Sequence, residues 1–409
     1  MKRVLFTGLA FVLVIWTAPQ LRARPQESST RIVAVGDIHG AAGGLTEILR
    51  AAGLIDARGR WSGGAARLVQ TGDFTDRGQE VRAAMDLLMR LEGEAKRAGG
   101  RVDVLFGNHE GMNVLRDVRD VSPQTYAAFT DKRSEDRRRR AFEAHVAITK
   151  PADSARRRDA WMAARPTGYV EYLQAMGPSG KYGRWIRSRR AVLQIGDTIF
   201  MHAGLRPDST SSVEDINRDV ERDIRSWDRL VAALERQRLA APTFTLQEVV
   251  DAAQREINSI GEAQQSGQPV ADHVTPEFIS HLKRFQGLIA GPLVDPQGPL
   301  WYRGLANLPD QAEPQIETLL RRYDAQRIVV GHTPQLPGGR ITARFGGRVI
   351  LIDTGMLSSH YRGGQPSALE IQDGRLTAIY RSTREPLSPG DRTSVSLLRP
   401  ALAAAATNR

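Results

Sequence analysis

Three segments in the first 111 residues share one design, which is the feature that most constrains the fold. Each is a short run rich in β-branched residues, followed by glycine and then by aspartate or asparagine. They read R-I-V-A-V-G-D-I-H-G (31–40), R-L-V-Q-T-G-D-F-T-D-R-G (67–78) and R-V-D-V-L-F-G-N-H-E-G (101–111). Glycine lets the backbone turn sharply at the carboxyl edge of a sheet, where α/β proteins place their ligands. Three strands are therefore predicted to carry polar side chains to one point.

The absence of cysteine narrows the chemistry available at that point. Without cysteine there are no disulfides, no thiolate metal sites and no cysteine nucleophile, so a metal must be held by His, Asp, Glu or Asn. Such ligands favour hard or borderline divalent ions. A chain of 409 residues with 41% hydrophobic residues can bury a full core, as one large decorated domain or two modest ones.

Positive charge is concentrated in one part of the chain. The formal net charge is +11, and residues 131–190 hold 16 Lys and Arg against 7 Asp and Glu, a local excess of 9. The charge suits a phosphorylated partner, and no nucleic acid is expected. Runs such as Arg137 to Arg140 are typical of a solvated helix face, and the alternative is a basic wall that faces the substrate.

The two ends of the chain are predicted to lie outside the folded domain. Residues 1–25 combine Met1-Lys2-Arg3 with an apolar run from Val4 to Trp16, the layout of a signal peptide. This predicts a secreted or periplasmic protein. Cleavage after Ala23 would need a small residue at position 21, and Leu21 is not small. An uncleaved amino-terminal membrane anchor is therefore the alternative. Residues 386–409 are predicted to be a disordered tail.

Between these ends, residues 31–385 are predicted to form one catalytic domain. Strands and helices alternate up to residue 111, and two largely helical inserts, about 113–190 and 207–299, are expected to cap the site. Further expected elements are a hairpin at 191–201, helices at 213–239, 246–260 and 315–323, a loop at 261–269, and strands at 327–330, 349–352, 368–371 and 376–380.

Five of the predicted strand ends together deliver six candidate metal ligands. Singly, an aspartate after a strand is usually a helix cap, and a lone histidine is usually structural. Together, the mixed set with no thiolate matches what a site for two divalent ions requires, with one carboxylate shared between the ions. Asp73 is the natural bridge, because its strand stands between the other two in sequence. The six residues are Asp37, His39, Asp73, Asn108, His202 and His332.

The order and spacing of five motifs resemble the calcineurin-like metallophosphoesterase superfamily. The motifs are G-D-I-H-G, G-D-F-T-D-R-G, G-N-H-E, H-A-G and G-H-T-P. The second and third are similar to those of the phosphoprotein phosphatase family. Leu300-Trp301-Tyr302-Arg303 resembles a motif of its bacterial-type branch, the Shewanella-like phosphatases. The chain departs from eukaryotic serine/threonine phosphatases in its long inserts and in lacking an S-A-P-N-Y-like segment.

This resemblance implies an α/β (α+β) fold, with two β-sheets packed face to face and flanked by helices. It implies two divalent ions of manganese, iron or zinc, manganese being favoured. Asp37, His39 and Asp73 would hold the first ion. The second ion would be held by Asp73, Asn108, His202 and His332.

The resemblance also implies roles for residues that are not metal ligands. His109 would protonate the leaving oxygen, oriented by Asp76. Arg77 would bind the phosphoryl oxygens, together with Asn108, and Arg303 is a candidate second clamp. The implied reaction is direct attack of a metal-bridging hydroxide on a phosphate monoester, without a phosphoenzyme.

The substrate class stays open at this point. Phosphotyrosine or phosphoserine/threonine in a protein, or a small phosphate ester, is expected. The alternatives are a dinucleoside polyphosphate hydrolase, because such enzymes share the motifs, and a catalytically dead secreted binding protein, which a missing ligand would have favoured.

Overall fold

Two mixed β-sheets form the centre of the computed structural model, which describes residues 31–150, 154–288 and 291–388. The six-stranded sheet has the order β11-β10-β9-β1-β2-β3, in which β1, β2 and β3 are parallel and β9, β10 and β11 antiparallel to their neighbours. Its strands are β1 (Ile32–Val35), β2 (Arg67–Gln70), β3 (Arg101–Val104), β9 (Ala368–Gln372), β10 (Arg375–Ile379) and β11 (Arg384–Pro386).

The five-stranded sheet has the order β4-β5-β6-β8-β7, with β5, β6 and β8 parallel. The antiparallel strands β4 and β7 close its two edges. Its strands are β4 (Val192–Ile195), β5 (Thr198–Met201), β6 (Arg327–Val330), β7 (Thr342–Arg344) and β8 (Val349–Leu351).

The sheets pack face to face because successive side chains of their strands point to opposite faces, both of which are buried. Ile32 and Ala34 of β1 lie in one apolar cluster with Phe200 of β5 and Val329 of β6, which places this cluster between the sheets. The other β1 side chains, including Val33, belong to a second cluster that contains the helices. Successive side chains of β1 thus point to opposite faces of the sheet, and both faces are buried. A strand inside a sandwich that is flanked by helices requires this pattern. The predicted double-sheet α/β fold is confirmed.

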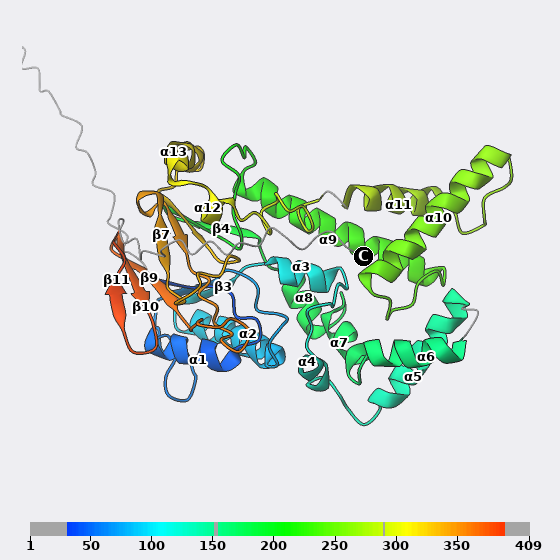
Figure 1. Cartoon of the computed structure of the whole chain (residues 1–409), viewed down its shortest axis with the longest axis horizontal. Helices are drawn as coiled ribbons and strands as arrows, with labels where there is room; N and C mark the ends of the chain where they lie inside the picture. Colours follow the sequence, from blue (N-terminus) through cyan, green and yellow to red (C-terminus); the bar gives the residue numbers. More distant parts are fainter. Residues whose placement is uncertain (1–30, 151–153, 289–290, 389–409) are drawn as a thin grey trace, which may run out of the picture.

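Helices cover the outer faces and extend beyond one end of the sandwich (Figure 1). Helices α1 and α2 lie on the six-stranded sheet and α13 lies beside the other. The two inserts contribute α4 to α8 and α9 to α11. The helices are α1 (Ala42–Ala51), α2 (Val81–Arg97), α3 (Asn108–Val114), α4 (Pro123–Ala127), α5 (Ser134–Thr149), α6 (Ser154–Ala164), α7 (Tyr169–Met176), α8 (Lys181–Arg187), α9 (Val213–Arg236), α10 (Leu246–Ser266), α11 (Pro276–Leu288), α12 (Gly304–Asn307) and α13 (Glu313–Arg322), with 3₁₀ turns η1 (Asp310–Ala312) and η2 (Phe345–Gly347).

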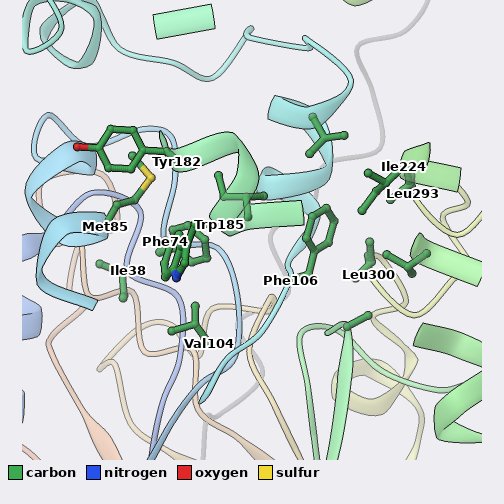
Figure 2. Close-up of a cluster of buried hydrophobic side chains, with 14 of the residues drawn as sticks. Ile38, Phe74, Met85, Val104, Phe106, Tyr182, Trp185, Ile224, Leu293 and Leu300 are labelled. Atoms are coloured by element: carbon green, nitrogen blue, oxygen red, sulfur yellow. The ribbon is translucent and has the colours of Figure 1, made fainter. Parts of the chain in front are cut away.

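One part of the core anchors the loop that follows β2. Phe74 is fully buried and its ring centroid lies 5.1 Å from that of Trp185 in α8. Figure 2 shows this pair beside Ile38, Val104 and Met85. The loop residue between two candidate site aspartates is therefore held by apolar packing from both the sheet and the first insert.

Some elements differ from the prediction. The predicted loop at 261–269 is wrong over most of its length, because α10 continues to Ser266 and ends at Gly267, which has a positive φ of 67°. Helix α11 and the short edge strands β7 and β11 were not predicted. Pro386, assigned to the tail, pairs with Thr377 as part of β11.

The predicted signal peptide or anchor (1–25) and the part of the tail from 389 onward lie outside the described residues, so both stay predictions. Within the described ranges, no helix has the length and apolar character needed to cross a membrane.

Candidate active site

The polar side chains at the carboxyl ends of β1, β2 and β3 meet those at the ends of β5 and β6 at one edge of the sandwich. Several of them line a cavity of about 390 Å³. All six predicted metal ligands are buried. The cavity is lined by Asp37, Asp73, Arg77, Asn108, His109, Met112, Arg119, Asp120, Trp301, Arg303, His332, Pro334, His360 and Tyr361.

The backbone around this cavity adopts unusual conformations. Asp73, Asp76 and Arg77 in the loop after β2, and His332 after β6, all have φ between 58° and 66°. Non-glycine residues seldom adopt this left-handed region, and such strain is typically concentrated at functional sites. Gly107 is required for a different reason: a Cβ atom there would lie 2.3 Å from Asp73 Oδ1.

Asp73 lies at the centre of the site. Its Oδ2 atom is 3.3 Å from His202 Nε2, 3.6 Å from His39 Nε2 and 3.9 Å from His109 Nε2. Asp73 also belongs to both groups whose donor atoms are close enough to hold one ion, namely His39–Asp73–His109 and Asp73–His202–His332. Its central position agrees with the strand order, because β2 lies between β1 and β3.

Three histidines present one ring nitrogen to this centre and use the other on the backbone. His39 Nδ1 lies 3.0 Å from the carbonyl of Thr75, and His202 Nδ1 lies 3.1 Å from that of Thr71. His332 Nε2 donates to the carbonyl of Trp301 at 3.1 Å. A backbone acceptor of this kind fixes the tautomer and leaves the second nitrogen free to bind a metal. Asn108 Oδ1 completes the set, 2.7 Å from His202 Nε2.

The carboxylates of this site fit a divalent cation. Burial, followed by the charges of Asp353 and Asp73, raises the pKa of Asp37 well above its usual range. Burial also lowers the pKa of His332 to about 2, so this imidazole is neutral and able to act as a ligand. Asp353 is buried, and its Oδ2 atom has no hydrogen-bond partner among the described residues. Buried, crowded carboxylates and neutral imidazoles are stabilised by a bound metal ion.

His109 is held differently from the other three histidines. Its Nδ1 donates to Asp76 Oδ2 at 2.8 Å, and Asn113 Nδ2 donates to the other Asp76 oxygen at 2.8 Å. Tyr172 in α7 donates to Asn113 Oδ1 at 2.5 Å, so the first insert supports this chain of bonds. Although burial lowers the pKa of His109, the charges of Asp73 and Asp76 raise it to about 9. A charged imidazole oriented by a carboxylate can donate a proton from Nε2.

Arg77 lies over the histidines at the mouth of the cavity. Nη1 donates to His39 Nε2 at 2.6 Å, and Nη2 lies 3.0 Å from His109 Nε2. Tyr361 contacts Nη1 through its hydroxyl group. Arg303 is directed to the backbone, because its Nη1 donates to the carbonyl of His332 at 2.6 Å and its side chain also lines the cavity.

Glu110, Tyr361 and Asp353 are among the residues at the site that were not predicted from the sequence. Glu110 is fully buried and accepts hydrogen bonds from the backbone N–H groups of Asp73, Phe74, Thr75 and Gly107. Tyr361 and Asp353 come from chain segments without a recognised motif. The position of Glu110 directly after His109 was a usable signal, since a glutamate there can cap the turn that starts α3. For the other two, only Asp353-Thr354-Gly355 at a strand end offered a signal.

The other four histidines belong to none of the five motifs, and the structure places them in two kinds of surroundings. His145, His273 and His281 lie near glutamates of the inserts. His360 instead lines the cavity, next to Tyr361.

Comparison with known proteins agrees with this geometry. The family model of the calcineurin-like phosphoesterases matches residues 30–234. The chain is 32% identical to Shewanella-like protein phosphatase 2 of Arabidopsis thaliana over 214 residues, which cover 49% of this chain and 52% of the relative. It is 25% identical to Shewanella-like protein phosphatase 1 of Plasmodium berghei over 355 residues, covering 85% of this chain and 74% of the relative.

A solved structure shows the same fold. The cold-active protein-tyrosine phosphatase of a psychrophilic Shewanella species superposes with a TM-score of 0.53 at 24% identity. The superposition covers 88% of this chain and 81% of that chain.

Proposed function

Because the chain belongs to the calcineurin-like phosphoesterases and two of its relatives are named protein phosphatases, we propose that it removes phosphate from phosphoproteins with the help of two divalent ions. The observation that carries the proposal is the central position of Asp73. Its carboxylate belongs to both groups of described side chains whose donor atoms are close enough to hold one ion. A shared carboxylate is the arrangement that a pair of ions about 3.5 to 4 Å apart needs.

The six buried ligands divide between the two ions. Asp37, His39 and Asp73 would hold the first, and Asp73 with Asn108, His202 and His332 would hold the second. Manganese is favoured, although iron and zinc suit the same atoms. When bound, the ions would supply Lewis acidity and lower the pKa of a water molecule to near neutrality.

The remaining steps fall to side chains of the cavity. Arg77 presents two guanidinium nitrogens at its mouth and binds two phosphoryl oxygens of the substrate, a geometry that lysine does not offer. Asn108 and Arg303 contribute further contacts to the phosphate. His109 Nε2 gives its proton to the leaving oxygen as the P–O bond breaks, and Asp76 keeps the ring oriented. Water attacks phosphorus directly, so no phosphoenzyme forms.

Activity after removal and return of metal tests this proposal. The protein would be stripped with a chelator and assayed against phosphotyrosine peptide, phosphoserine peptide and diadenosine tetraphosphate, with manganese, iron or zinc restored in turn. We expect hydrolysis of a phosphopeptide only after metal is restored. Preferred hydrolysis of diadenosine tetraphosphate would instead make the protein a dinucleoside polyphosphate hydrolase.

Replacement of the bridging carboxylate gives a sharper test. Asp73→Asn should abolish turnover, because the residue loses its charge between two cations. Metal content and circular dichroism would be measured in parallel. More than about a tenth of the wild-type rate, with both ions still bound, would correspond to a barrier change below about 1.4 kcal/mol and would contradict the two-metal assignment.

A further inference from the structure

The two helical inserts enclose a groove that adjoins the catalytic cavity. This insert groove has a volume of about 640 Å³, within the range of ligand sites. Arg119 lines both the insert groove and the cavity, so the two adjoin each other at this side chain. Its other lining residues come from the start of the first insert, the end of α6 and the start of α10 (Figure 1). They are Arg116, Asp117, Val118, Val121, Pro123, Tyr126, Ala163, Ala164, Pro166, Thr245, Leu246 and Gln247.

Specific contacts hold the inserts together around this groove. Arg165, which directly follows α6, donates to Glu248 of α10 at 2.6 Å, and its guanidinium stacks 4.8 Å from the Trp161 ring. The hydroxyl of Tyr169 donates to the carbonyl of Thr243 at 3.0 Å. The groove is thus built in advance by buried and partly buried interactions, which reduces the ordering cost of binding.

The wall of the insert groove combines positive charge with apolar surface. Arg116 Nη2 pairs with Glu235 at 2.8 Å, while Nη1 is buried and has no hydrogen-bond partner in the described part of the chain. The Arg119 side chain is 69% exposed and pairs with Asp117. Around these two guanidinium groups lie Val118 and other small or apolar side chains. An extended peptide with an acidic side chain would satisfy such a wall.

We propose that the insert groove binds the polypeptide segment next to the phosphorylated residue of a protein substrate, with an acidic side chain of that segment directed at the exposed Arg119. The inference rests on the phosphatase function proposed above and specifies its substrate as a protein rather than a small ester. The shared Arg119 is the structural link. When the phosphate of the substrate binds at Arg77, the polypeptide that leaves the cavity past Arg119 would enter the groove.

The test blocks the groove without touching the cavity. Ala163 is exposed on α6, and Ala163→Trp places a large ring in the groove. The matched control is Ala83→Trp on α2, also exposed and lining neither space. Three metal-loaded proteins would be assayed on a long phosphopeptide with acidic flanks, its neutral-flank counterpart and the same phosphoamino acid with capped ends.

For Ala163→Trp we expect kcat/KM on the long acidic peptide to fall about tenfold relative to the capped phosphoamino acid, through KM and with kcat unchanged. The control should behave as the wild type. The preference of the wild type for acidic flanks should shrink as salt rises, and Arg119→Gln should weaken it.

The outcomes separate the two proposals. If the wild type hydrolyses the capped phosphoamino acid but gains nothing from peptide length, the groove proposal is overturned and the phosphatase function stands. The same conclusion follows if Ala163→Trp matches the control. A metal-loaded wild type that hydrolyses none of the esters overturns both. Melting curves check folding, and Ala164→Trp replaces Ala163→Trp if the latter does not fold.

Discussion

The hydrogen-bond partner of the distal ring nitrogen distinguishes two kinds of histidine at this site. His39, His202 and His332 each pair that nitrogen with a backbone carbonyl, whereas His109 pairs it with the carboxylate of Asp76. A carbonyl fixes a neutral tautomer, and a carboxylate also stabilises the charged ring. His109 lies within ligand distance of Asp73, so distance alone would admit it as a metal ligand. Its hydrogen bond to Asp76 favours the role in proton transfer proposed above.

His109→Ala should leave metal content unchanged and lower the rate by about a hundredfold or more, the usual contribution of a positioned proton donor. The loss should shrink markedly on an aryl phosphate with a leaving group as acidic as dinitrophenol, because that group departs without a proton. Rates on alkyl and aryl esters would be compared at saturating metal. Equal losses on both would mean that His109 positions the phosphate instead.

Glu110 controls the geometry of the loop that carries Asp73 and Asp76. Its carboxylate accepts from Asp73 N at 2.7 Å and from Gly107 N at 2.9 Å, and thereby joins the loops after β2 and β3. Glu110→Gln would turn an amide N–H₂ group toward backbone donors and leave some of them unsatisfied. We expect a loss of about 2 to 3 kcal/mol in unfolding free energy by denaturant titration.

Activity measurements on Glu110→Gln distinguish a role in positioning the loop from a role in stability alone. Below its melting transition, Glu110→Gln should still show a lower kcat and weaker metal retention, since the strained loop is no longer held. Full activity of the folded fraction would restrict Glu110 to a stabilising role.

The six candidate ligands could be named from the sequence, because each lies at the end of a predicted strand in a recognisable motif. Asp353 and Tyr361 escaped prediction for a physical reason. Tyr361 reaches the site through a long irregular segment after β8, and its contact with Arg77 joins residues far apart in the chain. Contacts of this kind depend on how the sheets pack, which local patterns do not encode.

At the scale of elements, periodicity predicted strands well and helix ends less well. Strand β6 was predicted with its observed bounds, because four apolar-rich residues lie between a polar turn and a glycine. Helix α10 was predicted to stop before Gly261, yet it continues for a further turn and more. A single glycine costs a helix only about 1 kcal/mol relative to alanine, and the good helix formers that follow offset it. Helix α11 buries Phe278, Leu282 and Phe285 at helical spacing, a signal that was present in the sequence.

Helix α9 contains a buried carboxylate that should weaken the fold. Asp223 is 6% exposed, its Oδ2 atom has no partner in the described ranges, and burial raises its pKa to about 6. Because the folded-state pKa lies above the unfolded one, this group lowers stability increasingly as pH rises from about 4 to about 6. Asp223→Asn should therefore stabilise the protein at pH 7.5 by about 1 kcal/mol, and the gain should disappear near pH 4.

Thermal melting at several pH values would check this prediction. The matched control is Asp219→Asn, one turn earlier on α9, where the carboxylate is 42% exposed and pairs with Arg222. The control should change stability little at any pH. A gain for Asp223→Asn that did not depend on pH would show that charge burial is not its cause.

At the scale of the whole molecule, the sandwich and the inserts contribute different parts of the site. The sheets bring strand ends together from both halves of the chain. The first insert contributes Arg119 and Asp120 to the cavity wall, and none of the described residues of 207–299 lines it. The expectation that both inserts cap the metal site therefore stays a prediction. The insert groove lies between the two inserts. No sequence pattern indicated it, because it depends on contacts between distant segments, such as that of Arg165 with Glu248.

The basic run of the first insert is paired within the molecule. Arg137 binds Asp131 at 2.7 Å and also contacts Glu171, and Arg138 donates to the carbonyls of Arg165 and Met162 at 2.7 and 2.5 Å. None of Arg137 to Arg140 lines the cavity or the insert groove. Of the two interpretations of this run, the structure favours a helix face with structural contacts over a wall that faces the substrate.

Substituting the arginines in pairs tests this distribution of charge. Arg137→Gln with Arg138→Gln should lower the unfolding free energy by about 1 to 2 kcal/mol, because bonds to buried or partly buried acceptors are lost. Arg139→Gln with Arg140→Gln is the control, and should change stability little, since both side chains are exposed. For both double variants, KM for an acidic phosphopeptide at low salt should equal that of the wild type. Each double variant removes the same net charge. If this insert attracted the substrate over a long range, the loss of that attraction would raise KM equally in both variants. If the arginines have a structural role, only the first variant should change, and only in its stability.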